Sequence, residues 1–194
     1  MLRILKGFIA VFFLFGVPSL LPGSIVRDSV FVVRLLFENP PTTLPVPVAG
    51  VKPRNLQDTW GAIRSGGRTH EGIDIFAPKG TPVHSTTHGI VMRVGQNRLG
   101  GNVVSVLEPG RQVHYYAHFE RVAPIRVGDI VWPGDLLGYV GNTGNARTTP
   151  SHLHYGLYLP GGRASIHFLC SPEISLRCRF ACAALSFRGK RFLI

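Results

Sequence analysis

The sequence predicts an all-β domain built mainly from antiparallel sheets, and three observations support this fold class. Residues 51–162 contain short apolar runs of strand type, and no long stretch repeats with the period of a helix. Turns rich in Gly and Pro separate the runs, and the chain has 23 Gly and 15 Pro. Its 194 residues suit one well-cored domain with extensions. Strands are expected at 89–94, 102–107, 113–118, 136–140 and 152–159.

The amino-terminal segment has the order of a secretory signal. Arg3 and Lys6 precede an apolar run at residues 8–21, which is shorter than the roughly 20 residues that a straight helix needs to cross a bilayer. Residues 1–23 are therefore expected to form a hydrophobic signal peptide or a membrane-anchor helix, and both alternatives stay open. A second apolar patch at 30–37 could prolong membrane association. Either alternative exports the chain to the cell envelope, in the periplasm or anchored to the outer face of the inner membrane.

Two flanking segments differ in composition from the strand-rich region. Residues 24–50 are apolar and then proline-rich, and the five prolines in the stretch from Asn39 to Pro53, with Pro53 included, predict a stiff linker. Residues 163–194 form an atypical basic tail that holds all three cysteines and shows neither strand alternation nor a helical pattern. The sequence assigns this tail no role.

The formal net charge of +11 is spread along the whole chain. Residues 1–50 contribute +2, residues 51–162 contribute +4, and the tail contributes +5. Because no basic stripe stands out, we expect a solvated basic surface and no nucleic-acid partner.

Two histidines in the last expected strand suit a metal site. Strand alternation places His152 and His154 on one face, while the leucines between and beyond them face the core. Both imidazoles could bind one ion, or one could bind while its neighbour handles protons. An H-x-H pair alone leaves a non-metal role open.

A second candidate pair lies earlier in the chain. His70 and Asp74 are four residues apart, and nearby Gly and Pro residues argue against a helix. Because Ile73 and Ile75 alternate toward the core, His70 and Asp74 should share the opposite face. Imidazole and carboxylate both bind Zn²⁺, although a surface ion pair would give the same spacing.

The third candidate is the strand at 113–118. Strict alternation places His114, Tyr116 and His118 on one face, and one of the two histidines could reach a site. Tyr116 could support the metal ligands or simply pack.

Together these segments resemble the lysostaphin-type zinc endopeptidases, the M23 or LytM-domain family, over about residues 45–162. The matching motifs occur in the family's order. They are His70-Glu71-Gly72-Ile73-Asp74, residues 77–83 (APKGTPV), Tyr116-Ala117-His118, Gly141-Asn142-Thr143-Gly144 and His152-Leu153-His154.

The resemblance implies a set of roles. His70, Asp74 and His154 would bind Zn²⁺, and His118 and His152 would be the catalytic pair, with the general base left undecided between them. Three protein ligands leave a fourth position for a water whose pKa falls to about 7. The implied function is hydrolysis of peptide bonds in the stems or cross-links of peptidoglycan, and the bond that is cut stays open.

Three other functions share single features with this sequence. A non-catalytic LytM-domain regulator would activate a cell-wall amidase, but it would lack zinc ligands that this chain retains. A biotinyl or lipoyl carrier resembles residues 126–138, yet no Lys lies between Lys79 and Lys190 to carry the cofactor. A cupin metal site also uses H-x-H, but it expects a Glu and a later His.

Overall fold

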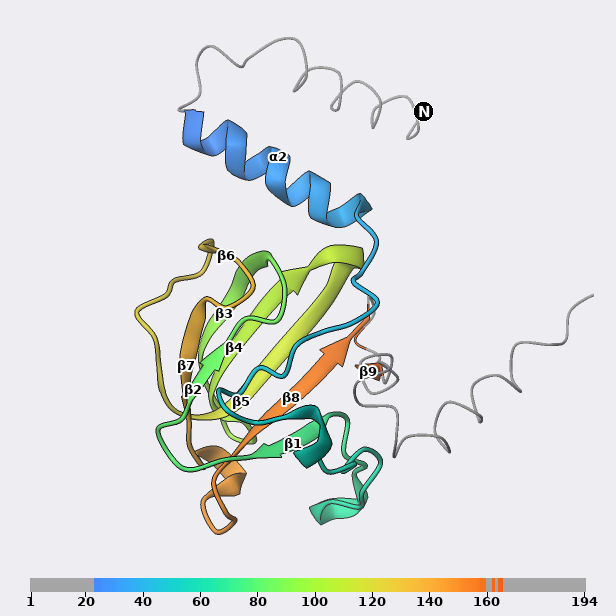
Figure 1. Cartoon of the computed structure of the whole chain (residues 1–194), viewed down its shortest axis with the longest axis vertical. Helices are drawn as coiled ribbons and strands as arrows, with labels where there is room; N and C mark the ends of the chain where they lie inside the picture. Colours follow the sequence, from blue (N-terminus) through green and yellow to red (C-terminus); the bar gives the residue numbers. More distant parts are fainter. Residues whose placement is uncertain (1–22, 160–161, 163, 166–194) are drawn as a thin grey trace, which may run out of the picture.

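The computed structural model describes residues 23–159, 162 and 164–165, and strands dominate this part (Figure 1). Every strand pair in it is antiparallel, which confirms the predicted fold class of the domain. The signal or anchor helix expected at 1–23 lies outside the described residues, apart from Gly23. The strands are β1 (Ile73–Phe76), β2 (Pro82–His84), β3 (Gly89–Asn97), β4 (Gly101–Glu108), β5 (Gln112–Val122), β6 (Ile130–Val131), β7 (Leu136–Val140), β8 (His152–Tyr158) and β9 (Ala164–Ser165).

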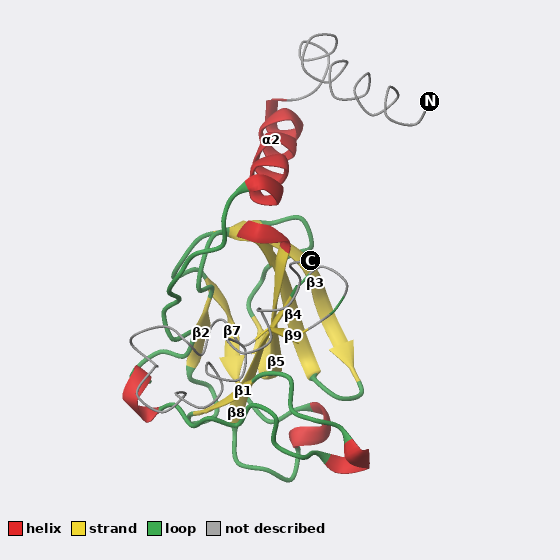
Figure 2. Cartoon of the chain, turned by 90° about the vertical axis from the view of Figure 1, so that its right-hand side faces the viewer, coloured by secondary structure: helices red, strands yellow, loops and turns green. Residues whose placement is uncertain are grey.

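The sheet order of the described strands brings distant parts of the chain together. The main path runs β1-β8-β5-β4-β3-β6, while β7 joins β5 to β2 and β9 adds to β8. Figure 2 shows the long strands β3, β4 and β5 side by side. β8 therefore lies between β1 and β5, so three segments that are remote in sequence become neighbours. β9 belongs to the first residues of the expected tail, and the rest of that tail lies outside the described residues.

The hydrophobic core lies between the main sheet and the β2–β7 pair. Val83 of β2, Val104 of β4 and Leu153 of β8 are fully buried in it. The proline-rich stretch contributes as well, because Leu44 and Val48 are buried and Val48 bridges to Val83. This part of the expected spacer packs along β2, since prolines hold it extended enough to insert alternate side chains into the core.

The expected common face of His114, Tyr116 and His118 is wrong. His114 and Tyr116 point into the core, where both are fully buried, and the Tyr116 ring packs there against Tyr155. The His114 Nδ1 atom lies 2.8 Å from a carboxylate oxygen of Glu108 and 2.8 Å from the hydroxyl of Tyr155. Burial raises the pKa of the Glu108 carboxyl, although His114 opposes that rise. This buried network is structural, and only His118 faces the other side of β5.

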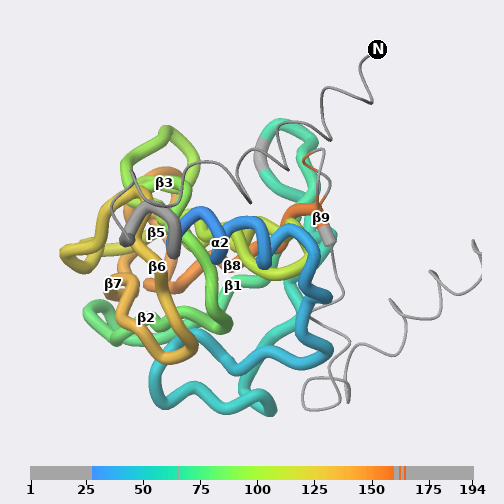
Figure 3. The backbone as a smooth tube through the Cα atoms, turned by 90° about the horizontal axis from the view of Figure 1, so that it is seen from above, coloured from blue at the N-terminus to red at the C-terminus, as the bar shows by residue number. Residues whose placement is uncertain are grey.

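A helix, α2 (Gly23–Phe37), covers one end of the domain (Figure 3). It occupies the first half of the segment assigned to a linker. Leu35 is buried against the domain, Phe31 meets Trp132 edge-on, and the Arg111 side chain donates to the Leu36 carbonyl at 3.1 Å. Among the described residues, no helix combines the length and apolarity needed to span a membrane. The described part of the chain also contains four single 3₁₀ turns: η1 (Pro53–Asn55), η2 (Ser65–Gly67), η3 (Pro109–Arg111) and η4 (Gly144–Ala146).

Candidate metal centre

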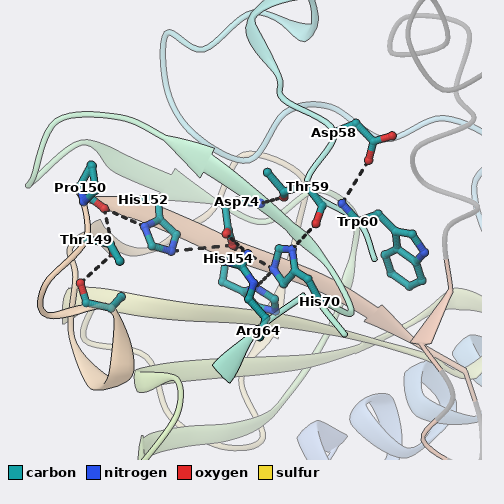
Figure 4. Close-up of polar contacts among 11 residues, drawn as sticks. Asp58, Thr59, Trp60, Arg64, His70, Asp74, Thr149, Pro150, His152 and His154 are labelled. Carbon is teal, nitrogen blue, oxygen red and sulfur yellow. Dashed lines mark hydrogen bonds and ion pairs between the residues drawn. The ribbon is translucent and has the colours of Figure 1, made fainter. Parts of the chain in front are cut away.

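The register of β1 against β8 assembles the three expected metal ligands. Asp74 is directly opposite His154 in this antiparallel pair. His70 lies three residues before the start of β1. The His70 Nε2 atom is 3.0 Å from Asp74 Oδ1 and 2.8 Å from His154 Nδ1, and the last two atoms are 3.2 Å apart (Figure 4). The convergence expected from the sequence is therefore present.

The tautomer of His70 follows from its second contact. The His70 Nδ1 atom lies 2.6 Å from the Thr59 carbonyl oxygen, which only accepts, so Nδ1 carries the proton. The Nε2 atom then presents a lone pair toward the Asp74 carboxylate and His154. Burial alone would raise the pKa of the Asp74 carboxyl, but the adjacent His154 and His70 imidazoles outweigh this effect and hold that pKa well below its usual range. The centre therefore gathers acceptor atoms around one point.

The two oxygens of the Asp74 carboxylate have different partners. Oδ1 faces the two imidazoles, whereas Oδ2 receives a hydrogen bond from the Arg64 guanidinium. The Asp74 backbone N–H donates to the Thr59 hydroxyl at 2.9 Å. Arg64 and Thr59 therefore leave one carboxylate oxygen for an ion and orient it, as partners of metal ligands commonly do. Sequence analysis did not find them, because neither residue belongs to a recognisable motif.

The geometry fits a divalent ion with nitrogen and oxygen ligands. In tetrahedral zinc sites the ligand atoms lie about 2.0–2.1 Å from the ion, which places them roughly 3.3 Å from each other. The three separations here, 2.8–3.2 Å, come close to that value. Gly72 is required beside this cluster, because a β-carbon there would lie 2.7 Å from the His154 ring. Two imidazoles and one carboxylate form a donor set that suits zinc.

His118 and His152 lie beside the ligand cluster with their rings 5.0 Å apart. His118 Nδ1 is 2.8 Å from the Thr143 carbonyl oxygen, and His152 Nδ1 is 2.8 Å from that of Pro150. Because carbonyl oxygens only accept, both Nδ1 atoms are protonated and each Nε2 atom carries a lone pair. The His152 Nε2 atom lies 3.8 Å from Asp74 Oδ1, which places it at the edge of the ligand cluster. Burial lowers the pKa of the His118 imidazole to about 4, so this ring is neutral at neutral pH.

The backbone at His118 explains how its side chain reaches this face. His118 has a φ of 66°, a left-handed conformation that is uncommon outside glycine. The pairing of β5 with β4 shifts register between Asn102 and Val104, beside this residue, and the His118 N–H donates to the Gly100 carbonyl at 2.7 Å. Strict alternation stops here, so His118 turns away from the core while Tyr116 remains in it.

All five residues line one open pocket of about 960 Å³. Its floor is formed by β5 and β8, and its walls by the loop before β1 and by the β3–β4 hairpin. The family model for peptidase family M23 matches residues 68–165, which contain all five positions.

The chain belongs to peptidase family M23. Among curated relatives of this M23 chain, the L-Ala–D-Glu endopeptidase of Bacillus subtilis (strain 168) is 42% identical over 128 residues, which are 62% of this chain and 39% of that protein. The peptidoglycan DD-endopeptidase ShyC of Vibrio cholerae is 33% identical over 56% of this chain and 24% of its own length. The chain thus spans about two fifths or less of the length of these two relatives.

Solved structures show the same fold. The catalytic domain of lysostaphin from Staphylococcus simulans superposes with a TM-score of 0.52 at 29% identity and covers 58% of this chain and 90% of that domain. A zinc-containing peptidase from Vibrio cholerae gives a TM-score of 0.53 at 26% identity, over 66% of this chain and 38% of the other. The M23 fold and the arrangement of a peptidase domain are therefore shared.

Proposed function

We propose that this M23 chain is a zinc-dependent endopeptidase that hydrolyses peptide bonds in the stems or cross-links of peptidoglycan. The proposal rests on the convergence of three side chains: the nearest nitrogen and oxygen atoms of His70, Asp74 and His154 lie 2.8–3.2 Å from one another. His118 and His152 lie beside them. The named activities of the relatives support the substrate class, because one is a peptidoglycan DD-endopeptidase and another is an L-Ala–D-Glu endopeptidase.

The ligand triad has a defined task in this mechanism. His70 through Nε2, Asp74 through Oδ1 and His154 through Nδ1 would hold the ion. A zinc ion with three protein ligands supplies a Lewis acid and an activated water near neutral pH. Arg64 keeps the second Asp74 oxygen engaged, which favours a single bond from that carboxylate and keeps the remaining side of the centre open to the pocket.

The two remaining histidines would move the proton and steady the developing charge. Each presents an Nε2 lone pair because its Nδ1 atom donates to a backbone carbonyl. One can accept the proton of the attacking water at this lone pair, while the other can take up a proton from solvent and donate it to the oxygen of the scissile carbonyl. Their fixed tautomers prepare both rings to accept a proton, so either can be the general base.

The direct test is digestion of purified peptidoglycan with the zinc-loaded full chain. We expect new amino and carboxyl termini within the peptide stems or cross-links, identified by mass spectrometry, and no reaction after removal of zinc. Intact stems after prolonged incubation would contradict the proposal. Metal-free protein that leaves stems intact yet stimulates a cell-wall amidase would instead support the regulator alternative, with the amidase as its partner.

We further propose that the domain acts outside the cytoplasm, in the periplasm or at the outer face of the inner membrane. The charge-then-apolar order of residues 1–23 motivates this location, as does an exposed stripe on α2. Val30, Val33 and Phe37 follow helical spacing on the side away from the domain, and Phe37 is 80% exposed. Such a stripe suits contact with a lipid surface close to the amino terminus.

Protease accessibility measures this location. In cells whose outer membrane has been permeabilised, added protease should degrade the M23 domain while a cytoplasmic marker survives. Carbonate washing then distinguishes the two alternatives, because an anchored chain stays with the membrane and a cleaved one is released. Full protection of the domain in intact spheroplasts would rule out the proposed location.

A further inference from the structure

The pocket around the proposed metal centre is lined by more basic than acidic side chains. Its lining includes four arginines (Arg64, Arg68, Arg93 and Arg98) and only two acidic residues, Glu71 and Asp74. The formal charge of these six side chains is therefore +2, and a divalent ion would bring the pocket to +4. Such a pocket favours an anionic substrate segment over a neutral one.

Arg93 lines the pocket because β3 contains a bulge. Val91 pairs with Val106, but Arg93 pairs with Ser105, so one extra residue is inserted between them. After this bulge Val94 packs on the core cluster, and Arg93 and Asn97 both line the pocket. Bulges commonly redirect a side chain next to an active site. Without this one, strict alternation from Val91 would place Arg93 on the core face.

Arg98 projects from a turn whose backbone is held at several points. The Asn97 side chain accepts from the backbone N–H groups of Gly100 at 2.6 Å and Leu99 at 3.1 Å, and it donates to the Tyr115 hydroxyl at 2.9 Å. The Asn145 N–H donates to the Leu99 carbonyl at 3.0 Å, which fixes the turn against η4. Arg98 is therefore presented from a rigid edge of the pocket, which reduces the entropy lost on binding.

Arg64, on the opposite wall of the pocket, has a different role from Arg93 and Arg98. Arg64 is engaged with Asp74, so its guanidinium belongs to the metal centre. Among the described residues, neither Arg93 nor Arg98 forms an ion pair with a carboxylate, and Arg93 contacts only the Gln96 carbonyl, at 3.3 Å. The guanidinium group is well suited to bind a carboxylate through two parallel hydrogen bonds. The β3–β4 wall thus offers two such groups to a substrate.

We propose that Arg93 and Arg98 select substrate peptides that carry a free carboxylate next to the scissile bond. This inference rests on the proposed peptidase function and adds a substrate class to it: an acidic peptide, such as one with a glutamyl residue, is preferred over its amidated or glycine-only counterpart. The carboxylate lies along the β3–β4 wall and the scissile bond lies over the metal centre.

The test measures binding, so that it does not depend on turnover. Two synthetic peptides that differ only in Glu or Gln beside the scissile bond are titrated by calorimetry into the zinc-loaded full chain in a His118→Ala background, which keeps the peptides intact. We expect the Glu peptide to bind about ten- to hundredfold more tightly, the range that charge-assisted hydrogen bonds supply. The Arg93→Gln/Arg98→Gln double variant should lose this preference, while its affinity for the Gln peptide stays the same.

A matched control removes two positive charges elsewhere. Arg54 and Arg126 are exposed and lie outside the pocket lining, so Arg54→Gln/Arg126→Gln should keep the full preference. Equal binding of the two peptides, or a Glu preference that survives in Arg93→Gln/Arg98→Gln, overturns the proposal. Glycerol phosphate that binds more tightly than the Glu peptide also overturns it, because the anion would then be a wall-polymer phosphate. Failure of peptidoglycan digestion alone would contradict only the peptidase function.

Discussion

Replacing His154 with alanine should abolish both zinc binding and hydrolysis. This substitution removes one of the three proposed protein ligands, and it leaves His70 and Asp74 as the remaining pair. We expect zinc affinity to fall by more than about 100-fold, the upper range for losing only a supporting partner of a ligand. Zinc stoichiometry after gel filtration, determined by mass spectrometry, measures the first effect, and peptidoglycan digestion measures the second.

A matched histidine variant separates this effect from a general loss of stability. His84 lies in β2, outside the pocket lining, and His84→Ala should retain the ion and the activity. The circular dichroism of His154→Ala should stay that of a β-protein, because the core face of β8 is formed by its neighbours Leu153 and Tyr155. One equivalent of tightly held zinc in folded His154→Ala would show that this histidine is not a ligand.

The three proposed metal ligands show how much of the site can be predicted from the sequence. His70 and Asp74 share a face by simple alternation, and the same rule places His154 opposite Leu153. Alternation cannot state, however, that residues 74 and 154 become direct partners across β1 and β8. Only the resemblance to a known family joined the motifs, because strand pairing over some 80 residues is decided by the packing of the whole sheet.

Local backbone irregularities explain the wrong prediction for β5. His114 and Tyr116 follow the period of two and are buried, but His118 breaks it through a left-handed residue and a register shift. The histidine that the family resemblance selects is therefore the one that simple periodicity misplaces. Deviations of this kind cluster at functional sites, where the surrounding structure compensates for the strain.

The residues that hold His70 and Asp74 in place, Thr59 and Arg64, could not be predicted from the sequence for a different reason. Thr59 and Arg64 lie in irregular chain, and their contacts to His70 and Asp74 depend on how that loop folds over β1. Composition likewise marked the proline-rich stretch as a linker but could not reveal that Leu44 enters the core. Contacts made by loops carry no periodic signal, so tertiary structure is needed to find them.

Replacing His118 with alanine should separate metal binding from turnover. His118 lies beside the three proposed zinc ligands but is not one of them, so the variant should retain one zinc ion. Loss of a positioned proton acceptor commonly lowers the rate by about 10²- to 10⁴-fold, and we expect kcat to fall within that range. Stopped assays of peptidoglycan digestion and zinc stoichiometry on the same sample measure both properties.

The left-handed backbone at His118 calls for a second variant, because alanine is strained at a φ of 66°. Asparagine tolerates this conformation better than alanine but supplies no basic nitrogen, so His118→Asn should fold well and still be inactive. Added imidazole should partly restore turnover to His118→Ala, since it returns a neutral base to the space beside His152 while leaving the zinc content unchanged. If His118→Asn hydrolyses peptidoglycan at the unmodified rate, the proton must move through another group, and His152, whose Nδ1 atom is held by the Pro150 carbonyl, is the one already in place.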